Sequence, residues 1–164
     1  LAVNFSRVTM LQNDFVERFD SVVRRFDIPA SFLHVEITES AFSADEKVII
    51  DIIADLQERG FPIAMDDFGT GYSSLSLLKS MPIDVLKIDR GFLSASEDDA
   101  RSRRVLEYVI ALANALGIDT VCEGIETAEQ AALLRSLECD IGQGYYFARP
   151  MPLAAFRERY TSAR

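Results

Sequence analysis

The sequence is poor in residues that build several common kinds of site. It has one histidine, His34, and two cysteines, Cys122 and Cys139, among 164 residues. A histidine-rich zinc site, or a Ser-His-Asp triad elsewhere in the chain, is therefore excluded. His34 lies in a strand pattern, which favours a packed, hydrogen-bonded side chain. Both cysteines have apolar neighbours, which is typical of reduced core thiols in a cytoplasmic protein.

Long apolar runs and excess positive charge are also absent. No run approaches the roughly 18 residues of a membrane span, and no signal peptide is visible. The net charge of −9 offers no general surface for duplex nucleic acid, so an anionic ligand would need local lysines, arginines or metal ions. Because the first residue is Leu1 and not methionine, we expect a piece of a longer protein or a processed chain.

The composition that remains, 49% hydrophobic and 26% charged, is typical of one globular domain, which we assign to residues 1–164. Apolar periodicity predicts strands that alternate with helices. The expected strands cover 1–5, 32–38, 61–67, 84–89, 119–125 and 141–147. The expected helices cover 15–26, 48–56, 74–81, 101–116, 127–137 and 153–160, with caps at Asp14, 43–46 and 127–130. This order predicts a parallel sheet with helices outside, as an open sheet or a barrel.

Polar residues recur at or near the carboxyl ends of the expected strands. A barrel mouth brings such residues to one site, whereas an open sheet spreads them along an edge, so we favour a TIM-like (β/α) barrel. About six βα units fall short of eight, so we expect an incomplete barrel that lacks the first strands. The residues at these strand ends are Asn4, Glu36, Asp66, Asp67, Lys87, Asp89, Glu123 and Gln143.

The oxygen ligands among these residues suit a hard divalent ion, Mg²⁺ or Mn²⁺. The adjacent Asp66 and Asp67 could serve a two-metal site that hydrolyses a phosphodiester. Lys87 could hold the attacking water or neutralise phosphate charge, and Asp89 could orient Lys87. The structural alternative is that the acids cap helices or loops, as we expect for Glu39, and that Lys87 forms an ion pair. The proposed ligands are Asn4, Glu36, Asp66, Asp67 and Glu123.

Several stretches form a recognisable set of motifs. They are Val3-Asn4-Phe5-Ser6, Val35-Glu36-Ile37-Thr38-Glu39-Ser40, Asp66-Asp67-Phe68-Gly69-Thr70-Gly71-Tyr72-Ser73-Ser74-Leu75, Leu86-Lys87-Ile88-Asp89, Glu123-Gly124-Ile125-Glu126-Thr127, Gly142-Gln143-Gly144-Tyr145-Tyr146-Phe147 and Pro150-Met151-Pro152. Over nearly its whole length, the chain resembles the EAL-domain family of cyclic di-GMP phosphodiesterases.

The resemblance implies a TIM-like barrel and hydrolysis of cyclic di-GMP to linear pGpG. It implies that the five proposed ligands bind Mg²⁺ or Mn²⁺, that Lys87 assists the water nucleophile, with Asp66 and Glu123 also catalytic, and that Gln143 lines the site. It implies dimerisation through the Asp-Asp-Phe-Gly-Thr-Gly loop, and a sensor or GGDEF domain is a possible upstream neighbour. Supporting roles fall to Thr38, Glu39, Gly69, Thr70, Gly71, Asp89 and Glu126.

The Glu-Ala-Leu motif that names the family is absent. Its glutamate is a metal ligand in the family and its arginine contacts substrate phosphate. Three explanations stay open: a fragment of an intact enzyme, a chain completed by a partner or swapped segment, and a truncated domain retained for binding. The functional alternatives to a phosphodiesterase are a non-catalytic cyclic di-GMP receptor or interaction module and, less favoured, a metal-dependent barrel enzyme that uses Lys87 as a base.

Overall fold

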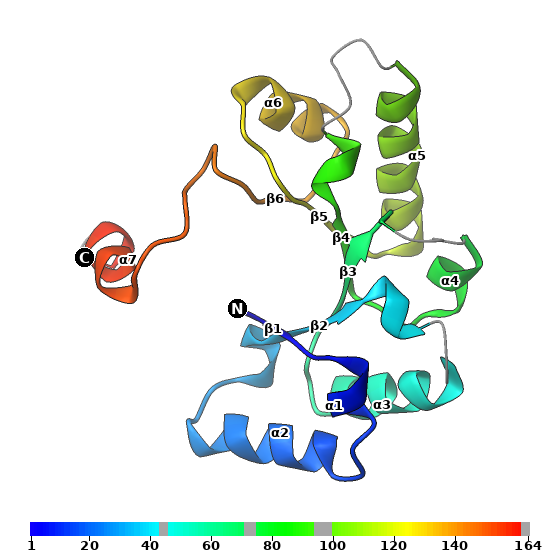
Figure 1. The fold of residues 1–164 in the computed structure, drawn as a ribbon, viewed down its shortest axis with the longest axis vertical. Coiled ribbons are helices and arrows are strands. Elements are labelled where there is room, and N and C mark those ends of the chain that lie inside the picture. The colour runs from blue at the N-terminus through cyan, green and yellow to red at the C-terminus, as the bar shows by residue number, and fades with distance from the viewer. Residues whose placement is uncertain (43–45, 71–74, 94–99, 162–164) are drawn as a thin grey trace.

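The computed structural model describes residues 1–42, 46–70, 75–93 and 100–161. Six strands form one sheet in chain order, and each neighbouring pair is parallel. The sheet curls into a half-barrel (Figure 1), which confirms the prediction of an incomplete TIM-like barrel. The strands are β1 (Ala2–Asn4), β2 (His34–Thr38), β3 (Ile63–Phe68), β4 (Val85–Ile88), β5 (Asp119–Cys122) and β6 (Ile141–Gly142).

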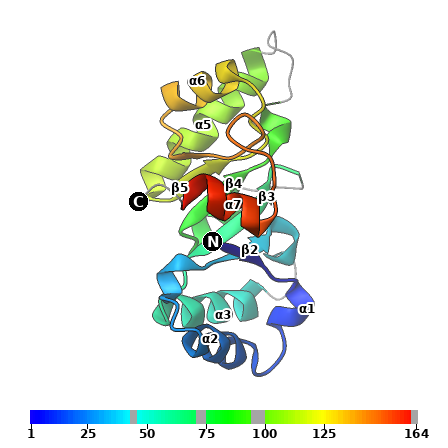
Figure 2. The same ribbon diagram turned by 90° about the vertical axis from the view of Figure 1, so that its left-hand side faces the viewer.

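Helices follow the strands and cover the convex face of the sheet, except α7, which lies on its concave side (Figures 1 and 2). Within the described ranges, no helix has both the length and the apolar character needed to cross a lipid bilayer. The helices are α1 (Arg7–Met10), α2 (Phe15–Arg25), α3 (Glu46–Glu58), α4 (Leu75–Ser80), α5 (Ala100–Leu116), α6 (Ala128–Ser136) and α7 (Leu153–Tyr160), with 3₁₀ turns η1 (Ala30–Phe32), η2 (Glu39–Phe42) and η3 (Arg90–Phe92).

The two faces of the sheet carry different side chains. Val35 and Ile37 of β2 are fully buried in the main apolar cluster, together with Ile49 and Ile53 of α3. Because strand residues alternate between faces, Glu36, which lies between Val35 and Ile37, points to the concave side. That side holds a smaller apolar cluster of Ala64, Val85 and Val121. The acids and Lys87 are therefore delivered to the concave side by the same alternation that builds the core.

Two predicted strands end earlier than expected. The strand expected over 141–147 is wrong beyond Gly142, because the following backbone turns back: Tyr146 N–H donates to Ile125 O at 2.9 Å and Phe147 N–H to Gly144 O at 3.1 Å. The strand expected over 119–125 ends at Cys122. The strand pattern of the sequence continues through both regions. The backbone there instead forms hydrogen bonds within the loops, and these end the strands early.

Helix caps agree with the sequence only in part. The capping box at Thr127 and Gln130 is confirmed: Gln130 N–H donates to Thr127 Oγ1 at 3.2 Å, and Gln130 Oε1 accepts from Thr127 N–H at 3.1 Å. The Asp14 side chain makes no capping hydrogen bond to α2. Ser6 caps the unforeseen short helix α1 through Thr9 N–H. The cap expected at 43–46 falls on residues 43–45, outside the described residues.

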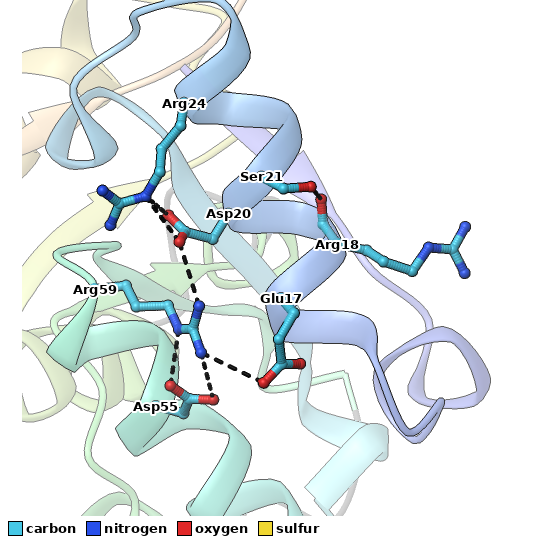
Figure 3. Close-up of polar contacts among 7 residues, drawn as sticks. All are labelled: Glu17, Arg18, Asp20, Ser21, Arg24, Asp55 and Arg59. Carbon is cyan, nitrogen blue, oxygen red and sulfur yellow. Dashed lines mark hydrogen bonds and ion pairs between the residues drawn. The ribbon is translucent and has the colours of Figure 1, made fainter.

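Arg59 joins α3 to α2 through a set of ion pairs (Figure 3). Its Nε lies 2.8 Å from Asp55 Oδ1, Nη1 lies 3.2 Å from Asp20 Oδ2, and Nη2 lies 3.5 Å from Glu17 Oε1. Arg24 Nε donates to both oxygens of the buried Asp20 at 2.9 Å. The hydrogen bond from Arg24 is the main reason that the pKa of Asp20 lies below its usual range. Asp20 is thus buried as a paired carboxylate that fixes one helix against the other.

Asp140 connects the loop before β6 to β5. Its Oδ2 accepts from Thr120 N–H and Thr120 Oγ1, both at 2.8 Å, and Thr120 is fully buried. These bonds lower the pKa of Asp140. Because the folded-state pKa is depressed, the stabilisation is present above the unfolded value of about 3.9 and is lost as pH falls through the folded value.

We therefore expect Asp140→Ala to lower the free energy of unfolding by about 1–2 kcal/mol at pH 7, since it leaves buried donors of Thr120 unpaired. The difference from wild type should shrink when urea unfolding is repeated below about pH 4. The neighbouring, exposed Asp119 gives the control Asp119→Ala, for which we expect a small, pH-independent change. A difference for Asp140→Ala that is equally large at both pH values would contradict this account.

Candidate active site

The ammonium group of Lys87 contacts three carboxylates that come from three different strands or strand ends. Lys87 Nζ lies 2.7 Å from Glu36 Oε1, 2.7 Å from Asp66 Oδ1 and 2.8 Å from Glu123 Oε1. Glu36 belongs to β2 and Asp66 to β3, Lys87 belongs to β4, and Glu123 directly follows β5. We call these four side chains the Lys87 cluster. The curled sheet thus brings residues that are far apart in the sequence to one point.

The Lys87 cluster is held in a poorly solvated place. Both Lys87 and Glu36 are buried. Burial opposes the charge of Lys87, but hydrogen bonds to Asp66, Glu123 and Glu36 outweigh it and raise its pKa above the ordinary value. Three carboxylates outnumber the one ammonium, so the cluster retains net negative charge. Such a place attracts a further cation.

Asn4 extends the cluster to β1. Asn4 and Glu36 are register partners in the β1–β2 pair, and Asn4 Nδ2 donates to Glu36 Oε2 at 2.7 Å. Both oxygens of Glu36 are therefore engaged, one by Asn4 and one by Lys87. The amide oxygen of Asn4 is not used in this bond and is an additional ligand atom of the type that hard cations prefer.

A β-bulge places Asp66 and Asp67 side by side at the end of β3. Met65 pairs with Leu86 and Phe68 with Ile88, so β3 has one more residue than β4 over this interval. Asp67 takes a left-handed φ of 58°, and its N–H donates to Asp66 Oδ1 at 3.0 Å. In a regular strand the second acid would point into the apolar layer, whereas the bulge leaves it exposed at the mouth.

The electrostatics of Asp67 follow from this position. Desolvation, followed by the negative charge of Asp66, raises the pKa of Asp67. Its backbone is also unusual, because a left-handed φ is uncommon for residues other than glycine and costs conformational energy. Strain and unfavourable charge at adjacent acids are typical of functional sites. The bulge was not predicted from the sequence, although the spacing of three between the apolar Met65 and Phe68 departs from strand alternation.

The start of the glycine loop is fixed on two sides. Gly69 N–H donates to Glu39 Oε2 at 3.4 Å, and Glu39 is buried. Gly69 has a φ of 99°, and a Cβ there would lie 2.1 Å from a ring atom of Phe92, so any other residue would strain the backbone and displace the ring. Thr70 donates from N–H and Oγ1 to Asp67 O, at 3.2 and 3.0 Å. Glu39 thus contacts the loop as expected, whereas Gly71 lies outside the described residues.

Asp89 has a different contact from the one expected. Its Oδ1 accepts from Gly91 N–H at 2.7 Å and caps η3. Among the described residues, Lys87 forms its ion pairs with Glu36, Asp66 and Glu123, so the orientation of Lys87 by Asp89 stays a prediction without a direct contact to support it. The side chain of Asp89 therefore bonds to the turn that follows β4 and not to Lys87.

Three further predicted residues have contacts outside the Lys87 cluster. Gln143 is exposed just after β6, and its N–H donates to Cys122 O at 2.9 Å. Glu126 is exposed, with its N–H bonded to Gln130 Oε1 at 2.8 Å. Thr38 Oγ1 lies 3.2 Å from Ser40 Oγ at the end of β2. Their placement in the active site therefore stays a prediction.

Comparison with known proteins identifies the fold's family. Residues 1–150 match the family described as EAL domain. The chain belongs to the EAL domain family. It is 40% identical over 152 residues to the cyclic di-GMP phosphodiesterase RocR of Pseudomonas aeruginosa, a match that covers 93% of this chain and 39% of RocR. The chain spans between about a fifth and two fifths of the length of such curated relatives.

Solved EAL structures have the same fold. The EAL domain of Mycobacterium smegmatis DcpA matches with a TM-score of 0.92 and 36% identity, over 100% of this chain and 74% of that one. Klebsiella pneumoniae BlrP1, solved as a manganese and cyclic di-GMP complex, matches with a TM-score of 0.86 and 28% identity, over 92% of this chain and 38% of that one. These matches support the half-barrel and the chain order of its strands.

The donor set of this EAL domain fits a divalent metal by its chemistry. Within the part of the chain that the structure describes, no three histidine, cysteine or acidic residues form a ready-made metal cage. The carboxylates of Glu36, Asp66 and Glu123 are instead arranged around Lys87 Nζ. They nevertheless share one small region with Asp67 and Asn4, and they offer only oxygen. Oxygen donors with excess negative charge suit Mg²⁺ or Mn²⁺.

Both cysteines are free thiols. Burial raises the pKa of the Cys122 thiol to about 12. Burial also raises the pKa of Cys139, which is half-buried. Both sulfurs are therefore protonated thiols near neutral pH, which is the inert form.

Proposed function

We propose that the protein carrying this EAL domain is a metal-dependent phosphodiesterase that hydrolyses cyclic di-GMP to linear pGpG in bacterial second-messenger signalling. The observation that carries the proposal is the Lys87 cluster, in which a buried ammonium and three carboxylates meet at the mouth of the half-barrel. The names of relatives such as RocR support the substrate. We also propose a cytoplasmic location, where such a messenger acts.

We assign Asn4, Glu36, Asp66, Asp67 and Glu123 to holding Mg²⁺ or Mn²⁺ in a two-metal site. When bound there, divalent ions would activate a water molecule and neutralise charge on the phosphate. Lys87 would donate hydrogen bonds to the attacking water or to a phosphate oxygen. Gln143 would contact the substrate, and Glu39 would keep the glycine loop, and with it Asp67, in place.

The experiment that tests this function is incubation with cyclic di-GMP and Mn²⁺, followed by chromatography of the nucleotides. We expect linear pGpG, and we expect a chelator or Lys87→Ala to abolish it. Absence of pGpG with the folded whole protein and added metal would contradict the proposal.

The second candidate is a non-catalytic receptor for cyclic di-GMP. It is favoured by one observation, that Lys87 already pairs with the carboxylates in the described structure. Calorimetry distinguishes the two candidates. A receptor would bind cyclic di-GMP without hydrolysis, and Lys87→Ala would leave its affinity unchanged.

We further propose that the domain forms a homodimer through the loop region that begins at Asp66, and that a sensor or GGDEF domain precedes it in the whole protein. The position of Gly69 between Glu39 and Phe92 supports a loop of fixed shape at its start. Such a loop could transmit a change at a dimer contact to Asp67. Sedimentation of the chain, with and without cyclic di-GMP, tests the dimer.

Asp67→Gly should separate stability from metal binding. Glycine adopts the φ of 58° without strain, which offsets its larger entropy loss, so the free energy of unfolding should stay within about 1 kcal/mol of wild type. Affinity for Mn²⁺ should fall by about tenfold or more, because one carboxylate ligand is lost. Urea unfolding and metal titration measure the two quantities.

Asp67→Asn is the matched control, since asparagine tolerates the left-handed region but carries no charge. It should lose Mn²⁺ affinity as Asp67→Gly does. Unchanged affinity in both variants would remove Asp67 from the proposed ligands.

A further inference from the structure

We propose that Lys87 is the resident counter-cation of the carboxylate cluster, and that its side chain must leave these carboxylates for a divalent ion to bind. This inference rests on the proposed function, because it concerns the same metal site. It assigns to Lys87 a role in controlling metal affinity that is separate from any role in catalysis. Three properties of the cluster carry it: hydrogen-bond capacity, ligand availability and charge.

The hydrogen-bond capacity of Lys87 is fully used. An ammonium group has three N–H donors, and Nζ lies within 2.8 Å of one oxygen on each of three carboxylates. No donor is left for a water molecule or a phosphate oxygen. Lys87 can therefore take its proposed part in catalysis only after at least one of these bonds has broken.

The ligand oxygens are also engaged. Glu36 uses one oxygen with Lys87 and the other with Asn4. Asp66 Oδ1 accepts from both Lys87 and the N–H of Asp67. Because a carboxylate oxygen has two lone pairs, an ion that takes this oxygen of Asp66 as a ligand must replace one of its two hydrogen bonds. The cation that all three carboxylates share, and that a metal ion would replace, is the ammonium group of Lys87.

Charge makes simultaneous occupancy unfavourable. An ammonium and a divalent ion that share the same carboxylate oxygens lie close together and repel each other in a poorly solvated place. Conversely, removing the ammonium leaves the buried carboxylate of Glu36 without its cationic partner and with only the hydrogen bond from Asn4, which destabilises the metal-free fold. Lys87 thus stabilises the domain without metal and weakens its affinity for metal.

The variant that tests this is Lys87→Met, which keeps the apolar stem and removes the charge. Without metal, its melting temperature should lie below that of wild type. Its affinity for Mn²⁺, measured by calorimetry on the 164-residue chain, should rise by about tenfold or more. Mn²⁺ should then raise the melting temperature of the variant by more than that of wild type.

Two controls separate this effect from a general change in charge. Lys79→Met removes the same charge from an exposed position in α4 and should leave Mn²⁺ affinity unchanged. Lys87→Arg keeps a cation in the cluster and should bind Mn²⁺ no more tightly than wild type. A Lys87→Met affinity equal to or weaker than wild type, or matched by Lys79→Met, would overturn the inference.

The remaining outcomes are also decisive. If Lys87→Met is unfolded without metal by circular dichroism, recovery of the fold on addition of Mn²⁺ supports the inference, and failure to recover overturns it. If wild type hydrolyses cyclic di-GMP while Lys87→Met gains no metal affinity, only the inference fails. If wild type binds no Mn²⁺, the proposed metal site fails and the inference falls with it.

Discussion

Asp66→Asn is expected to lower the rate of cyclic di-GMP hydrolysis by about a thousandfold or more. Asp66 is the acid that Lys87 contacts at 2.7 Å from the neighbouring strand, and its Oδ1 also accepts the N–H of Asp67. The amide keeps the shape of the side chain but removes the charge needed to hold a divalent ion. The loss should appear in steady-state rates at saturating Mn²⁺, measured from the pGpG produced.

Asp51→Asn is the matched control, because Asp51 is an exposed acid of α3 on the convex side of the sheet. It makes the same chemical change away from the Lys87 cluster, so its rate should equal that of wild type. Comparable circular dichroism spectra of the two variants would show that Asp66→Asn has not simply unfolded. Hydrolysis by Asp66→Asn at the rate of Asp51→Asn would exclude Asp66 from the active site.

Gly144→Ala is expected to lower the free energy of unfolding by about 3 kcal/mol, close to the upper end for overpacking. A Cβ at Gly144 would lie 2.1 Å from the carbonyl oxygen of Ile125 and 2.3 Å from its nitrogen. Both atoms belong to backbone, so the chain itself must shift. Ile125 follows Glu123 by two residues and accepts from Tyr146 N–H, so the shift should also disturb the site. Urea unfolding measures the loss.

Gly117→Ala is the control for the loss of glycine alone. Gly117 has a φ of 72°, and a Cβ there would have no atom within 4 Å. Its substitution should cost about 1 kcal/mol, from backbone strain without a clash. Equal losses of unfolding free energy for the two variants would show that the close approach of Gly144 to the backbone of Ile125 does not contribute to stability.

The sequence was sufficient for features that depend on local periodicity. The alternation of Val35 and Ile37 with Glu36 defined both a strand and the face that carries the acid. The Thr127 capping box was visible from its spacing alone and is formed as expected. Polar residues at successive strand ends predicted a common site, because parallel strands point their carboxyl ends in one direction. Lys87, Glu36, Asp66 and Glu123 do meet there.

The features that sequence did not provide depend on long-range contacts or on backbone irregularity. The bulge at Asp66 and Asp67 is a property of the β3–β4 register, not of β3 alone. The end of β6 at Gly142 follows from hydrogen bonds to Ile125, on a different strand end. Asp89 directly follows the strand that carries Lys87 but caps the next turn, because a backbone N–H lies two residues away. Periodicity contains none of this information.

The most direct test of the central claim is the identity of the nucleotide formed from cyclic di-GMP in water labelled with heavy oxygen, with Mn²⁺ present. Our account predicts linear pGpG with one heavy oxygen in its terminal phosphate. It predicts no pGpG after the metal is removed with a chelator, or with the Asp66→Asn variant. Recovery of unlabelled, intact cyclic di-GMP from a folded protein that binds both nucleotide and metal would contradict it and would favour a receptor.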